Sequence, residues 1–238
     1  MNIILKVQRY NPEIDDQPYF QEYALEANPN ERLLDALMNV KRFQDGSLGF
    51  RKSCAHGVCG SDAMRINGKD GLACKTLIKE VAQKDGDTIT VEPLRYLPVQ
   101  RDLIVDQNDF FERYRSVKPF LINDGPVEEK ERLQSQEERM LFDDTTNCIL
   151  CASCYSACPI PEKIPAFIGP AAIAQAFRFL ADSRDRGMAD RLPALDRPDG
   201  VWACENHFEC TKCCPRSILI TKRINQTKKM IEKHKSTR

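Results

Sequence analysis

Residues 148–159 read Cys-Ile-Leu-Cys-Ala-Ser-Cys-Tyr-Ser-Ala-Cys-Pro. This C-x2-C-x2-C-x3-C-P spacing is typical of chains with two iron–sulfur clusters, in which the first three cysteines bind one cluster and the fourth binds the other. Zinc ribbons instead separate two C-x2-C pairs by about a dozen residues or more. The stretch therefore predicts a domain that folds around two clusters.

A second run of cysteines completes this pattern further along the chain. Cys204, Cys210 and Cys214, the last followed by proline, fit the same template, except that its second position is His207. Cys214 then crosses back to the first cluster. The predicted [4Fe–4S] ligands are Cys148, Cys151, Cys154 and Cys214. The neighbouring Cys213 lies outside the template and is not predicted to be a ligand.

Three thiolates remain for the other cluster, those of Cys158, Cys204 and Cys210. A cubane with one unligated corner tends to lose that iron, so the residues predict a [3Fe–4S] cluster. The alternative is that His207 binds a fourth iron, which would leave a second [4Fe–4S] cluster.

An earlier stretch predicts a third cluster. Residues 53–60 read Ser-Cys-Ala-His-Gly-Val-Cys-Gly, and the plant-type [2Fe–2S] pattern is C-x4-C-x2-C with a distant fourth cysteine. The third position here is an aspartate, whose oxygen suits hard ferric iron. The predicted ligands are Cys54, Cys59, Asp62 and Cys74, with water or Ser61 as alternatives to Asp62.

Composition narrows the class of protein. The chain has 238 residues, 11 cysteines, and 35 basic against 35 acidic side chains, which gives a net charge of zero. A balanced charge argues against nucleic-acid binding, whose footprint is a basic domain. No run of 18 apolar residues predicts a membrane span. The N-terminus does not resemble a secretory signal, so a disulfide framework is not expected.

The first part of the chain predicts a small domain with a sheet. Residues 3–8 and 19–26 alternate as half-buried strands do, and Asn67-Gly68 is a tight-hairpin signal after residues 63–66. A last strand is expected over residues 88–92. Helical spacing follows Asn30, which is the expected N-cap.

The second part predicts helices, over residues 109–118, 166–181 and 217–233. Pro170 is expected in the first turn of the middle helix, where its missing N–H costs little. Together the two parts predict an α+β chain with domains at residues 1–104 and 105–238. A substrate-converting site is not expected, because the glycine fingerprint, P-loop and nucleophile elbow are all absent from the sequence.

The order of these motifs resembles the iron–sulfur subunits of succinate dehydrogenase and quinol:fumarate reductase. The likeness covers nearly the whole chain. The matching stretches are 53–62, 67–68, 72–74, 98–102, 105–106, 167–172 and 182–185.

The resemblance implies a β-grasp [2Fe–2S] domain and a helical double-cluster domain. It implies two partners: a flavoprotein that interconverts succinate and fumarate at FAD, and a membrane anchor that binds quinone and holds any haem. Electrons would pass from flavin through the [2Fe–2S], [4Fe–4S] and [3Fe–4S] clusters to quinone, in the tricarboxylic acid cycle and respiration. The subunit would lie peripherally on the cytoplasmic face of the cell membrane.

The resemblance also implies that quinone binds near the third cluster, in the vicinity of Pro159, Glu205 and His207. Unlike some members, this chain has no tryptophan within residues 159–165, which leaves the quinone type open. Two other classes of function stay as alternatives: a freely diffusing ferredoxin, and a subunit of a reductase that uses thiols in place of quinone.

Overall fold

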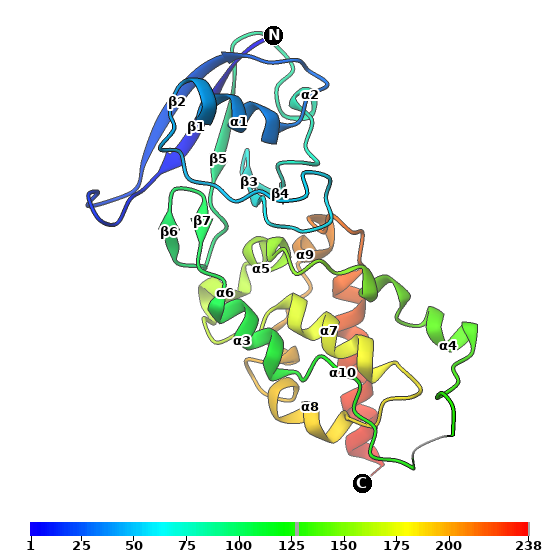
Figure 1. The fold of residues 1–238 in the computed structure, drawn as a ribbon. Coiled ribbons are helices and arrows are strands. Elements are labelled where there is room, and N and C mark those ends of the chain that lie inside the picture. The colour runs from blue at the N-terminus through cyan, green and yellow to red at the C-terminus, as the bar shows by residue number, and fades with distance from the viewer. Residues whose placement is uncertain (127–128, 238) are drawn as a thin grey trace. The chain divides into compact units, whose positions relative to one another are not determined.

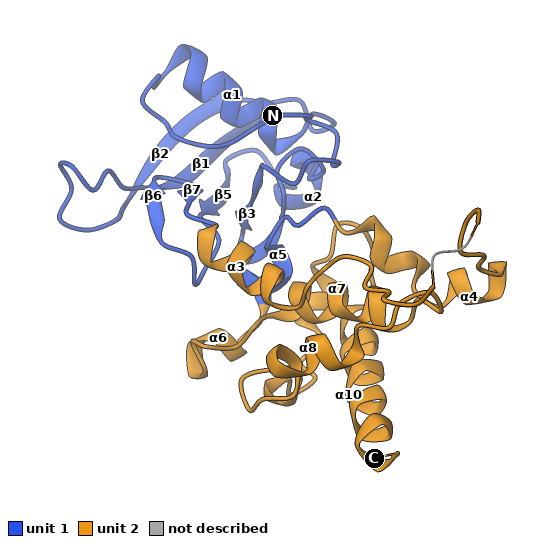
Figure 2. Cartoon of the chain, turned by 60° about the horizontal axis from the view of Figure 1, so that its bottom comes forward, with its two compact units in different colours: residues 1–107, 149–157 blue, residues 108–148, 158–238 orange. Residues whose placement is uncertain are grey.

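The computed structural model describes residues 1–126 and 129–237, and the chain divides into two compact units (Figure 2). The first unit comprises residues 1–107 and 149–157, and the second comprises residues 108–148 and 158–238. The sequence predicts two domains, residues 1–104 and 105–238, each formed by one continuous stretch of chain. The structure instead groups residues 149–157, part of the cysteine run, with the first unit.

A five-stranded mixed sheet forms the first unit, in the order β2-β1-β5-β3-β4 (Figure 1). β1 and β5 are parallel, and the other neighbours are antiparallel. The strands are β1 (Asn2–Arg9), β2 (Tyr19–Glu26), β3 (Ala63–Ile66), β4 (Lys69–Leu72) and β5 (Asp87–Glu92), and β6 (Val99–Arg101) pairs with β7 (Ile104–Val105). All the strands expected from alternation are therefore confirmed.

Helix α1 (Leu33–Phe43) buries one apolar face and contacts β2, completing the expected β-grasp fold. The buried residues of this face are Leu33, Leu34, Ala36, Leu37 and Val40. The helix begins later than predicted and Asn30 is not its N-cap. Asp35 Oδ2 accepts the N–H of Arg32 at 3.2 Å, while the Asn30 side chain instead accepts a bond from Lys79. Two short helices, α2 (Ile78–Val81) and α5 (Ser153–Ala157), complete the unit, and α5 lies against β4.

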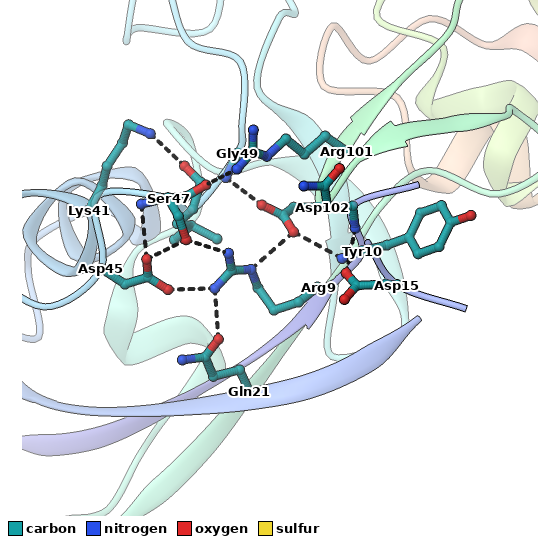
Figure 3. A network of polar contacts seen from close by, with 12 residues as sticks. Arg9, Tyr10, Asp15, Gln21, Lys41, Asp45, Ser47, Gly49, Arg101 and Asp102 are labelled. Atoms are coloured by element: carbon teal, nitrogen blue, oxygen red, sulfur yellow. Dashed lines mark hydrogen bonds and ion pairs between the residues drawn. The ribbon is translucent and has the colours of Figure 1, made fainter. Parts of the chain in front are cut away.

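A buried arginine ties together distant parts of the first unit (Figure 3). Arg9 Nε donates to Asp102 Oδ1 at 3.0 Å, and its Nη1 donates to Asp45 Oδ2 at 2.5 Å. The Asp102 side chain is 2 % exposed, and its other oxygen accepts the N–H of Gly49 at 2.6 Å. The network therefore fixes the end of β1 to the turn between β6 and β7 and to the loop after α1.

The same network sets the charge state of Asp45. Burial raises the pKa of this carboxyl, but hydrogen bonds from Ser47, Tyr23 and Arg9 outweigh it and hold the pKa well below its ordinary value. Because the folded-state pKa is lowered, Asp45 stabilises the fold above about pH 4, near its unfolded pKa. This contribution is lost as the pH falls from there through the folded-state pKa.

Helices make up the described part of the second unit, as predicted. They are α3 (Asn108–Ser116), α4 (Gln136–Met140), η1 (Asp143–Asn147), α6 (Ile160–Lys163), α7 (Pro170–Leu180), α8 (Met188–Leu195), η2 (Val201–Ala203), α9 (Glu209–Lys212) and α10 (Ile220–Ser236). α7 is almost entirely buried, with α3 and α10 packed against it, and Pro170 opens it as expected. Among the described residues, no helix has the length and apolar character to cross a bilayer.

Two arginines hold the second unit together. Arg191 is fully buried, bonds Asp185 at 2.7 Å and donates to the carbonyl of Phe120. Arg223 of α10 pairs with Asp144 at 2.6 Å and lies over the ring of Phe177, 5.0 Å from its centroid. Arg191 thus fastens α8 to the segments after α3 and α7, and Arg223 fastens α10 to η1 and α7.

Arg9→Met is expected to destabilise the first unit by about 3–5 kcal/mol, because it leaves two largely buried carboxylates without their cation. Urea denaturation followed by far-ultraviolet circular dichroism measures the effect. The control, Arg101→Met, changes an exposed arginine and should shift stability by less than about 0.5 kcal/mol. An unchanged midpoint for Arg9→Met would show that the network adds no net stability.

Candidate metal centres

The loop that carries the first two cysteines wraps its backbone around a sulfur atom. Three N–H groups point at Cys54 Sγ from 3.3–3.5 Å, those of His56, Val58 and Cys59. Gly57 and Gly60 have φ of 80° and 70°, values that favour glycine. The loop is thus built to present donors to sulfur, as a cluster site requires.

The donors change the acidity of the thiol. Hydrogen bonds from the N–H groups of His56, Cys59 and Val58 lower the pKa of Cys54 to about 6. The thiolate is the form that binds metal. Burial, followed by the neighbouring Asp62, raises the pKa of Cys74 to about 12. Metal binding deprotonates a coordinating thiol outright, so the burial of Cys74 is compatible with ligation.

Asp62 links the two parts of this site. Its side chain is buried, and Oδ2 accepts the N–H of Cys74 at 2.5 Å. The Ser61 hydroxyl lies 3.2 Å from Cys59 Sγ. The structure therefore brings the predicted [2Fe–2S] ligands Cys54, Cys59, Asp62 and Cys74 into one region of the first unit, while their roles as ligands stay a prediction.

The ligands predicted for the [4Fe–4S] cluster are divided between the units. Cys151 and Cys154 belong to the first unit, and Cys148 and Cys214 to the second. Cys154 is buried at the start of α5, and Leu150 and Ala152 beside it have positive φ of 53° and 64°. The backbone thus turns sharply between successive cysteines, as closely spaced ligands of one cluster require.

The three thiols predicted for the third cluster line one pocket in the second unit. Cys158, Cys204 and Cys210 surround it with apolar neighbours that include Ile160 and Phe167. Burial raises the pKa of Cys210, and its Sγ lies 3.4 Å from the hydroxyl of Thr221, a residue that also lines the pocket. The structure therefore brings the three cysteines predicted as [3Fe–4S] ligands to the lining of one pocket, while their roles as ligands stay a prediction.

The residues predicted to lie near quinone occupy the rim of this pocket. Pro159, Glu205 and His207 all line it. His207 Nε2 lies 2.9 Å from Glu205 Oε2, and Glu205 bonds Lys163 at 3.2 Å. Hydrogen bonds from His207 and Lys163 lower the pKa of Glu205. His207 therefore already has a carboxylate partner at Nε2, which counts against its use as an iron ligand through that atom.

Within the described residues, no three histidine, cysteine or acidic side chains are arranged to hold a single metal ion. The thiolates of an iron–sulfur cluster bind different iron atoms, so they need not converge on one point. Sequence reasoning missed Arg95 and Ser156, which bond each other in the first unit at 2.8 Å. Neither residue is part of a cysteine motif, so no local signal indicated the contact.

Comparisons with known proteins agree with this geometry. The chain matches the model of a 2Fe-2S iron-sulfur cluster binding domain over residues 4–112, and that of a 4Fe-4S dicluster domain over residues 144–218. It is 43% identical to a succinate dehydrogenase iron-sulfur subunit of Coxiella burnetii, over 92% of this chain and 93% of that protein. It is 44% identical to a fumarate reductase iron-sulfur subunit of Mycobacterium tuberculosis, over 91% and 87%.

A solved structure has the same fold. A chain of the Mycobacterium smegmatis Sdh1 complex in the apo form superposes with a TM-score of 0.81 at 27% identity, and the match covers 98% of this chain and 96% of that one. Fold, cysteine loops and domain matches together define an iron–sulfur electron-transfer protein with a 2Fe-2S domain and a 4Fe-4S dicluster domain. The chain belongs to the family of succinate dehydrogenase and fumarate reductase iron–sulfur subunits, which confirms the resemblance.

Gly60→Ala is expected to lower the cluster content of the purified protein. A Cβ at Gly60 would lie 2.7 Å from Cys151 Cβ and 3.1 Å from its Cα, and neither atom is at the end of a flexible side chain. Iron, sulfide and electron paramagnetic resonance (EPR) signals measure the loss.

Gly86→Ala is the matched control. Gly86 has φ of 85°, and nothing lies within 4 Å of the added Cβ, so the variant carries the backbone strain alone, about 1–2 kcal/mol. Equal cluster contents in both variants would show that the contact with Cys151 is unimportant.

Proposed function

We propose that the chain relays electrons between the FAD of a flavoprotein subunit and a quinone bound at a membrane-anchor subunit, in a succinate:quinone oxidoreductase. The clusters would supply one-electron chemistry, with [2Fe–2S], [4Fe–4S] and [3Fe–4S] in that order. The proposal rests on two places where the chain is arranged to bind iron through cysteine. In one, backbone N–H groups point at Cys54 Sγ, and in the other, one pocket is lined by Cys158, Cys204 and Cys210.

The ligands follow the three sets predicted above. Cys54, Cys59, Asp62 and Cys74 would hold [2Fe–2S]; Cys148, Cys151, Cys154 and Cys214 would hold [4Fe–4S]; Cys158, Cys204 and Cys210 would hold [3Fe–4S]. The three N–H groups directed at Cys54 Sγ would stabilise the reduced, more negative form, because hydrogen bonds to sulfur tune a cluster's potential. The chain's own residues would thus bind the clusters, shield them from solvent and adjust their potentials.

The rim of the pocket lined by Cys158, Cys204 and Cys210 suits the exchange of electrons and protons with quinone. Histidine is a common proton shuttle in proteins, and the Nε2 of His207 lies 2.9 Å from Glu205 Oε2 there. The pair would hold and pass protons as quinone is reduced or quinol oxidised. An anchor subunit would bind quinone and any haem, and would hold this subunit peripherally at the cytoplasmic face of the membrane.

Low-temperature EPR of the isolated complex, with spin counting, tests the proposal. Air-oxidised protein should give a near-isotropic signal from [3Fe–4S], and dithionite should bring out a slowly relaxing [2Fe–2S] signal. A silent oxidised sample with two reduced cubane signals would instead give the third site a [4Fe–4S] cluster, with His207 as the candidate fourth ligand.

Cys214→Ser is expected to damage the [4Fe–4S] cluster, whereas Cys213→Ser should leave all three clusters intact. The two cysteines are adjacent and both half-buried, so the second variant controls for the substitution itself. Cys213 Sγ lies 3.6 Å from the carbonyl of Cys210, a local contact. Cluster-specific EPR distinguishes the outcomes, and loss of a cluster in Cys213→Ser would overturn the ligand assignment.

Asp62→Cys is expected to retain [2Fe–2S] and to lower its midpoint potential, because a thiolate donates more electron density than a carboxylate. A redox titration monitored by EPR measures the shift. Ser61→Ala is the control for ligation and should leave the cluster intact. An unchanged potential in Asp62→Cys, or loss of the cluster in Ser61→Ala, would show that Asp62 is not the ligand.

A further inference from the structure

The segment of residues 149–157 carries two of the cysteines assigned to the [4Fe–4S] cluster, yet it packs within the unit that holds the [2Fe–2S] loop. Its helix α5 lies against β4, the strand that leads to Cys74. What holds this segment in place therefore affects how far apart the two clusters lie.

One end of the segment touches the [2Fe–2S] loop itself. Gly60 follows Cys59 directly and lies so close to Cys151 that even one added carbon would be only 2.7 Å from its Cβ. The carbonyl of Ile149 lies 3.3 Å from the same point. A loop carrying ligands of one cluster is thus in contact with a ligand of the other.

The other end is fastened by an arginine that follows β5. The backbone N–H of Arg95 donates to Ser156 Oγ at 2.8 Å, and its guanidinium Nε and Nη2 donate to the Ser156 carbonyl at 3.1 and 2.8 Å. Ser156 is fully buried, midway between Cys154 and Cys158. Three bonds from one residue, two of them charge-assisted, fix its position.

A carboxylate accompanies this contact. Asp70 of β4 lies beside both residues: burial raises its pKa, and the Ser156 hydroxyl and the charges of Arg65 and Arg95 oppose that effect. Because Ser156 Oγ accepts the Arg95 N–H, its own hydrogen is available to Asp70. The hydroxyl and the carbonyl of Ser156 are therefore both bonded to residues of the sheet domain.

We infer that Arg95 is a positioning residue that, through Ser156, holds the 149–157 segment on the [2Fe–2S] domain and so sets the separation of the [2Fe–2S] and [4Fe–4S] clusters. The close contact of Gly60 with Cys151 fixes the other end. The inference rests on the proposed function, which assigns the two clusters. Electron transfer between clusters depends steeply on distance, so loosening this attachment slows it without removing a ligand.

Arg95→Gln tests the inference in the purified complex, because it removes both guanidinium bonds and keeps every predicted ligand. The reduced [2Fe–2S] signal relaxes faster when a second paramagnetic cluster is close, so its microwave power saturation reports their separation. The power for half-saturation is expected to change severalfold in Arg95→Gln. Arg95→Lys, which keeps the charge and one donor group, should show a smaller change.

Arg101→Gln is the matched control, since Arg101 donates to the Ser47 carbonyl at 3.4 Å in the same unit. It should saturate as the unmodified protein does. The inference would be overturned if Arg95→Gln kept both cluster signals at full intensity and had the same power for half-saturation as the unmodified protein. That result would leave the proposed function intact. Absence of either cluster signal from the unmodified complex would instead mean that the proposed function fails.

Discussion

Iron–sulfur ligation demands that a backbone turn sharply around each sulfur, and this demand shapes the chain. Five non-glycine residues beside the predicted ligands have positive φ: Ala55, Leu150, Ala152, Asn206 and Phe208. Each such residue costs about 1–2 kcal/mol. The loops that carry the predicted ligands are therefore strained for a free polypeptide, and the proposed metal–thiolate bonds would offset that strain.

In each unit, buried ion pairs hold the helices and strands that carry these loops in one arrangement. In the first unit, the Arg9 network joins β1, the loop after α1 and the β6–β7 turn through one buried cation. In the second, Arg191 and Arg223 play the same part around the buried helix α7. Buried ion pairs are costly to break, so they specify one arrangement of the elements that carry the ligands.

The predicted sites differ in how their surroundings change the pKa values of the cysteine thiols. Cys54 lies in a half-buried loop whose N–H groups lower its pKa to about 6, whereas burial raises the pKa of Cys210 in its apolar pocket. Hydrogen bonding and solvent exposure are main determinants of cluster potential. Clusters held at these predicted sites would thus differ in potential although their predicted ligands are nearly alike.

The cysteine spacings and the period-two strands predicted a 2Fe-2S domain, a 4Fe-4S dicluster domain and the α+β fold class, because ligand spacing and local periodicity are properties of neighbouring residues. The resemblance of the motif order predicted the family. The tertiary structure alone decided that residues 149–157 pack with the sheet, that Arg9 joins Asp45 and Asp102, and that Arg95 fastens Ser156. These contacts join residues 36–93 positions apart, and no local pattern encodes them. They depend on burial and on the competition among charged groups for partners, which only the folded chain settles.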